Sequence, residues 1–198
     1  MNNNSANSEF ILSQLKELLS DDTYGYATAV VTYCETKSLN YNYIGMAEFR
    51  DALTHVQRAI SEDNESKVLS EINSASEHIR RAAVESMQEY VELKYAELRK
   101  RILIPEYKYL IAQYKKPLKS DLIASETAIK NNIILGREAK PRKEWQEAIG
   151  YFRKAEIELE KLEAILPTIK EVQDRYSNRV LICLGVILLI LLGLSTIR

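Results

Sequence analysis

The chain has 198 residues, of which 46% are hydrophobic and 28% are charged, so its composition is that of a globular protein and excludes a disordered one. Six glycines and four prolines supply little turn material for an all-β fold, and the abundance of helix-forming residues predicts an all-α fold. The net charge of −1 excludes an overall positive charge of the kind that attracts nucleic acid. Two cysteines and two histidines argue against a disulfide framework and a metal site, and we expect no cofactor.

Apolar residues at helical spacing predict three short helices in the first 60 residues. Their stripes are Phe10, Ile11, Leu15, Leu18 and Leu19; Ala27, Val30, Val31 and Cys34; and Phe49, Leu53, Val56 and Ile60. Spacings of three and four residues place each stripe on one helix face, which we expect to lie against a core. Polar segments at 21–22, 40–42 and 61–66 separate the helices.

A long helix is predicted from Ser66 to Arg101, and Pro105 should end or kink it. Its apolar series is Val68, Ile72, Ala75, Ile79, Ala82, Val91, Leu98 and Ile102. A shorter helix over 122–134 follows. The most regular series then recurs every three or four residues: Trp145, Ile149, Phe152, Ala155, Leu159, Leu162, Ile165, Ile169, Val172 and Tyr176. Pro167 predicts a kink within it.

The C-terminal segment carries the strongest signal in the sequence. Eighteen uncharged residues, 180–197, lie between Arg179 and Arg198, and all of Val180–Leu194 is apolar. As a helix this run rises roughly 27 Å, close to the roughly 30 Å of a bilayer's hydrocarbon core. It predicts a transmembrane helix, and the basic residues before it favour a cytoplasmic location for the preceding segment. The residues expected to contact the membrane or a pore are Arg179, Val180, Cys183, Gly185, Leu188, Leu192, Gly193 and Arg198.

We therefore expect three parts. Residues 1–138 form a helical bundle, residues 139–179 form an amphipathic stalk helix, and residues 180–197 form a single membrane-spanning helix. The lipid bilayer is the first expected partner. A second copy of the chain is the next, because one tail helix gains contacts by packing against others.

One segment of the bundle contains residues that could carry out catalysis, the segment RDALTH from Arg50 to His55. Histidine titrates near neutrality and moves protons, whereas arginine holds phosphate and stabilises developing charge. The two residues lie about 140° apart on a helix, so a composite site would need two copies of the chain. The alternative is that both are surface residues beside the Phe49 stripe. His78 is expected to be an ordinary, partly buried histidine near Glu77 and Arg81.

The segment RDALTH resembles the R-x4–6-H motif of the HEPN superfamily of small helical bundles, over residues 6–135. This resemblance implies metal-independent RNA cleavage by Arg50 and His55 at a dimer interface. A HEPN-like body with a membrane helix is also similar to the small membrane accessory proteins of type VI-B CRISPR systems, which accompany an RNA-guided RNase. That resemblance implies oligomerisation into a pore that depolarises the bacterial inner membrane during antiviral defence.

Three functions thus stay open. The first is a non-enzymatic membrane effector with charged rings at Arg179 and Arg198. The second is a membrane-tethered RNase toxin that uses Arg50 and His55, with RNA as its partner. The third is a tail-anchored scaffold without chemistry.

Overall fold

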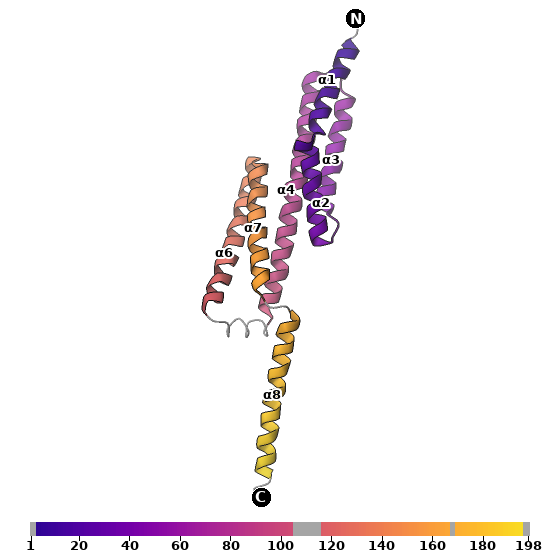
Figure 1. The fold of residues 1–198 in the computed structure, drawn as a ribbon. Helices are drawn as coiled ribbons and strands as arrows, with labels where there is room; N and C mark the ends of the chain where they lie inside the picture. Colours follow the sequence, from indigo (N-terminus) through magenta and orange to yellow (C-terminus); the bar gives the residue numbers. More distant parts are fainter. Residues whose placement is uncertain (1–2, 105–115, 167–168, 196–198) are drawn as a thin grey trace. The chain divides into compact units, whose positions relative to one another are not determined.

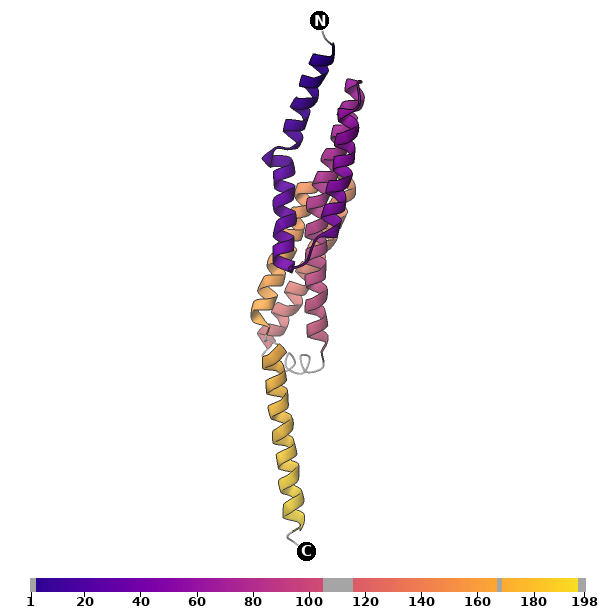
Figure 2. The same ribbon diagram turned by 90° about the vertical axis from the view of Figure 1, so that its right-hand side faces the viewer.

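The computed structural model describes residues 3–104, 116–166 and 169–195. Within these ranges the chain forms helices and no strand, which confirms the all-α prediction. In chain order the elements are α1 (Asn3–Leu18), the π-helix η1 (Asp21–Gly25), α2 (Tyr26–Ser38), α3 (Tyr43–Ile60), α4 (Glu65–Leu103), α6 (Lys116–Ala139), the 3-10 helix η2 (Lys140–Arg142), α7 (Trp145–Ile165) and α8 (Ile169–Ser195) (Figure 1). Figure 2 shows the chain changing direction between α1 and α2, at η1.

The long helix predicted from Ser66 is confirmed as α4, which ends at Leu103, before Pro105. Helix α6 is longer than predicted, because it begins at Lys116, and Pro117 falls in its first turn, where a missing backbone N–H costs nothing. The segment expected to be one stalk helix, 139–179, comprises η2, α7 and the beginning of α8. Pro105 and Pro167 lie outside the described residues.

The helices form two compact units, and the boundaries between these units fall within α4, α6 and α7. The first unit comprises residues 1–94 and 129–157, and the second comprises 95–128 and 158–198. The largest fully buried side chains of the first unit are Phe152, Met87, Ile129, Val68, Val84, Val91 and Cys34. They come from α2, α4, α6 and α7, so these four helices share one hydrophobic core.

A partly buried polar contact joins α2 to α7 inside the first unit. The Tyr33 hydroxyl donates to Glu156 Oε1 at 2.5 Å, and Glu156 is almost fully buried. Burial and this hydrogen bond raise the pKa of Tyr33. The Arg153 guanidinium lies 4.2 Å from the centroid of the Tyr33 ring and 3.5 Å from Glu156 Oε2, so it offsets the buried carboxylate's charge.

In the second unit, polar contacts join the end of α4 to α6, and α6 to α7. The Tyr95 hydroxyl donates to Glu126 Oε1 at 3.1 Å, and Arg99 Nε lies 3.9 Å from the same oxygen. The Ser125 hydroxyl donates to Glu158 at 3.4 Å. Beneath them, Leu98, Leu159 and Leu162 are fully buried, as the apolar series predicted.

The core face of α3 differs from the predicted one. Leu53 and Ile60 were expected in the core, yet they are 68% and 57% exposed. The buried residues of α3 are Gly45, Ala52 and Ala59, which recur every seven residues. A Cβ atom on Gly45 would lie 2.6 Å from the Ser86 hydroxyl oxygen of α4, so this face consists of small residues that permit a close helix–helix approach.

The packing of α6 on α7 can be tested with two glycines. A Cβ on Gly136 would lie 2.7 Å from the Phe152 ring, which is fully buried, whereas a Cβ on Gly150 would meet nothing within 4 Å. Gly136→Ala should lower the free energy of unfolding by about 1–3 kcal/mol through overpacking. Gly150→Ala should raise it by about 0.5–1 kcal/mol, because alanine favours the helix. Urea unfolding followed by far-UV circular dichroism measures both, and a stabilising Gly136→Ala would contradict this packing.

Candidate functional site

The structure does not bring Arg50 and His55 together within one chain. The Arg50 side chain is 76% exposed, and its Nη2 atom lies 3.2 Å from Oδ1 of the adjacent Asp51. His55 instead faces α4, where its Nδ1 atom donates to Glu71 Oε2 at 2.7 Å. The two candidate catalytic residues therefore occupy different faces of α3, as their spacing on the helix predicted.

His55 belongs to a polar cluster between α3 and α4, which we call the histidine network. The rings of His55 and His78 are stacked, with centroids 5.2 Å apart and an interplanar angle of 24°. His78 Nδ1 donates to Glu48 Oε2 at 2.7 Å, and Arg81 Nη2 donates to Glu48 Oε1 at 2.8 Å. With the Glu71 bond of His55, both imidazoles of the chain are held by a carboxylate from the opposite helix.

The histidine network has a reciprocal layout that the sequence analysis missed. Helix α3 carries Glu48 and His55 seven residues apart, and α4 carries Glu71 and His78 at the same spacing. Because the two helices run antiparallel through a short connection, each histidine meets the glutamate of its neighbour. The repeated seven-residue Glu–His spacing on two adjacent predicted helices is the signal that could have revealed it.

His78 is partly buried, as predicted, but its neighbours differ from those expected. Arg81 joins the network through Glu48, whereas Glu77 pairs with Lys143. The carboxylate that orients His78 thus comes from α3 and not from its own helix.

A carboxylate bonded to Nδ1 fixes both the orientation and the tautomer of an imidazole and leaves Nε2 for chemistry. The side chains of His55 and His78 are 21% and 20% exposed, so solvent reaches both. Such an arrangement suits proton transfer. Among the residues that the structure describes, no group of three His, Cys, Asp or Glu side chains is placed to hold a metal ion.

Helix α8 contains the other candidate residues. Every residue from Val180 to Ile190 is exposed, and the leucine, isoleucine and valine side chains among them are 41–70% exposed. Cys183 is exposed, and a Cβ on Gly185 would meet nothing within 4 Å. Leu192 and Gly193 belong to α8, but their surroundings lie outside the described part of the structure, as does all of Arg198. Over the described residues, no helix combines the length and apolar character needed to cross a membrane.

Comparison with known proteins identifies no family for this chain. No family model, curated protein or solved structure matches this chain. The function has to be inferred from the residues of the chain itself.

The histidine network predicts unequal effects for the two residues of the RDALTH segment. His55→Ala removes the partner of the Glu71 carboxylate and should lower the free energy of unfolding by about 1–3 kcal/mol. Arg50→Ala removes an exposed side chain and should change it by less than about 0.5 kcal/mol. Chemical unfolding of both variants measures the difference. Equal losses would show that Arg50 has a structural role as large as that of His55.

Proposed function

We propose that the chain is a membrane effector anchored through α8. The observation that carries this proposal is the surface of residues 180–190, which is apolar and exposed on every side of the helix. A helix that is apolar all round belongs in a protein core or in a bilayer. Soluble proteins rarely expose contiguous apolar patches larger than a few hundred Å².

The rest of the sequence supports this placement. The uncharged run continues to residue 197, and Arg179 precedes it. Lys170, Arg175 and Arg179 favour a body on the cytoplasmic side. An 18-residue helix rises roughly 27 Å, which is close to the roughly 30 Å of bilayer hydrocarbon.

A membrane effector of this kind acts as an oligomer. One apolar helix cannot enclose a water path, so ion flux requires several copies whose α8 helices surround a pore. Arg179 and Arg198 would then form charged rings at its two mouths. The resemblance to HEPN-like membrane accessory proteins suggests that this pore depolarises the bacterial inner membrane during antiviral defence, downstream of an RNA-guided RNase.

The proposal predicts that Leu188→Arg abolishes depolarisation. A charge near the centre of a membrane helix costs about 2.5–3.5 kcal/mol and disfavours both insertion and an apolar pore wall. Leu39→Arg is the matched control, because Leu39 is 89% exposed in the first unit, and it should retain full activity. A potential-sensitive dye measures depolarisation in cells that express each full-length variant during viral challenge.

The second candidate function is a HEPN-type RNase tethered to the membrane. The observation that favours it is the Glu71 carboxylate that orients His55, while Arg50 lies exposed where a second copy could reach it. RNA breakdown that persists in Leu188→Arg and is lost in Arg50→Ala would replace the effector proposal with this one. If the chain causes neither depolarisation nor RNA breakdown, the remaining function is that of a tail-anchored scaffold.

Cysteine labelling tests the membrane position of α8 directly. Burial raises the pKa of Cys34 to about 12, so at pH 8 only about one Cys34 thiol in ten thousand is the reactive thiolate. In intact inside-out membrane vesicles, which present the cytoplasmic face, a membrane-impermeant maleimide should leave Cys34 unlabelled for this reason. It should leave Cys183 unlabelled because the bilayer surrounds it. The Asn178→Cys thiol, just before the apolar run, should react, and denaturation in SDS should expose every thiol. Rapid labelling of Cys183 in intact membranes would show that α8 lies in water.

A further inference from the structure

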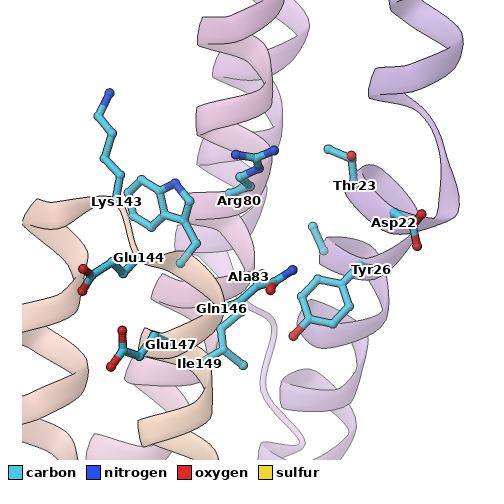
Figure 3. Close-up of a pocket in the computed structure, with 12 residues that line it drawn as sticks. Asp22, Thr23, Tyr26, Arg80, Ala83, Lys143, Glu144, Gln146, Glu147 and Ile149 are labelled. Carbon is cyan, nitrogen blue, oxygen red and sulfur yellow. The ribbon is translucent and has the colours of Figure 1, made fainter.

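The first unit contains a pocket of about 450 Å³ that is separate from the histidine network and from α8. Residues of η1, the first turn of α2, α4 and the segment 143–149 line it (Figure 3). This volume falls within the range of about 300–1,000 Å³ that is usual for sites of small organic ligands. Its polar and aromatic lining includes Asp22, Thr23, Tyr26, Arg80, Trp145 and Gln146.

The charged side chains around the pocket divide into paired and unpaired groups. Those that already have a partner are Lys143 with Glu77, Glu144 with Arg142, and Glu147 with the Tyr151 hydroxyl. Figure 3 shows Glu144 and Glu147 on the side of the pocket away from Asp22 and Tyr26. The side chains of Arg80 and Asp22 have no hydrogen bond or ion pair with any described residue. The pocket therefore offers one free guanidinium and one free carboxylate.

These two groups specify complementary chemistry on a ligand. A guanidinium presents a planar set of donors that matches a phosphate, and a carboxylate accepts N–H donors such as those on a nucleobase. Two aromatic side chains, Tyr26 and Trp145, line the same pocket and offer ring faces on which a base stacks. A free amino acid would satisfy Arg80 and Asp22, but it would leave most of the volume and both rings unused.

The backbone at the pocket adds to this preference. Trp145 is the first residue of α7, a helix of 21 residues. The first N–H groups of a helix have no acceptor within it, and the helix dipole favours an anion nearby. Arg80 and the start of α7 both line the pocket, and each favours a negatively charged group.

From these observations we propose that the pocket binds a nucleoside monophosphate. Its phosphate binds Arg80, its base stacks against Tyr26 and Trp145, and an N–H group of the base donates to Asp22. The proposal does not depend on membrane insertion, because every residue named belongs to the first unit.

The test uses the full-length chain in detergent micelles and the monophosphates GMP, AMP, CMP and UMP. Equilibrium dialysis should show that at least one of them binds with a Kd below about 1 mM. Trp145 is the only tryptophan of the chain, so binding should also change the intrinsic fluorescence saturably. Arg80→Ala should weaken binding by about tenfold or more. Arg58→Ala, at an exposed arginine of α3, should leave it unchanged.

Half-ligands separate the two parts of the proposed site. Inorganic phosphate and the parent nucleoside should each bind about tenfold or more weakly than the best monophosphate. Asp22→Asn should weaken binding of the monophosphate and leave binding of inorganic phosphate unaltered. Three results would each overturn the proposal: no binding of any of the four nucleotides, equal affinities of Arg80→Ala and Arg58→Ala, or phosphate binding as tight as that of the nucleotide.

Discussion

The close approach of α3 to α4 is the constraint on which the rest of the first unit depends. Gly45, Ala52 and Ala59 present almost no side-chain volume, and the Ser86 hydroxyl occupies the space that a larger residue at 45 would need. Ser86 satisfies its own hydroxyl by donating to the Ala82 carbonyl at 2.6 Å, so a polar group is accommodated in this dry contact. The same proximity lets short glutamate and histidine side chains bridge the two helices.

Several large apolar residues of α3 are exposed because small residues occupy its buried face. Tyr43, Met46, Leu53 and Ile60 are exposed, and Arg50 lies among them along the helix. Helix α8 exposes more of its large apolar side chains than α3 does, since those of residues 180–190 are exposed all round the helix. The histidine network pairs its polar groups between α3 and α4, whereas the described residues 180–190 of α8 expose an apolar surface. The proposed membrane anchor and the histidine network therefore belong to different parts of the chain.

The sequence predicted the helices well wherever apolar residues define a single face. Val68, Ile72 and Ile79 of α4 are buried as expected, because their helical spacing places them on one face of α4. On α3 the pattern was ambiguous, since a buried face of glycine and alanine has a weaker hydropathy signal than an exposed face with leucine and isoleucine. Hydropathy ranks residues by apolar area, and close packing selects them for small volume.

The candidate sites were harder to predict because they depend on long-range partners. The Arg50–His55 spacing was visible in the sequence, but the Glu71 carboxylate that orients His55 comes from another helix. The proposed nucleotide pocket combines residues near positions 22, 80 and 145, which no local motif connects. Only the fold brings such distant residues together.

The reciprocal glutamate–histidine layout also has a consequence for how the α3–α4 hairpin finds its alignment. Small residues that recur every seven positions would pack almost equally well if one helix slid by two turns. Such a slide in one direction would place Glu48 opposite Glu71, and in the other it would place Glu48 opposite Glu85. Each alternative sets like groups against one another, which is unfavourable between neighbouring helical side chains. The network thus selects one register from several that shape complementarity alone would accept.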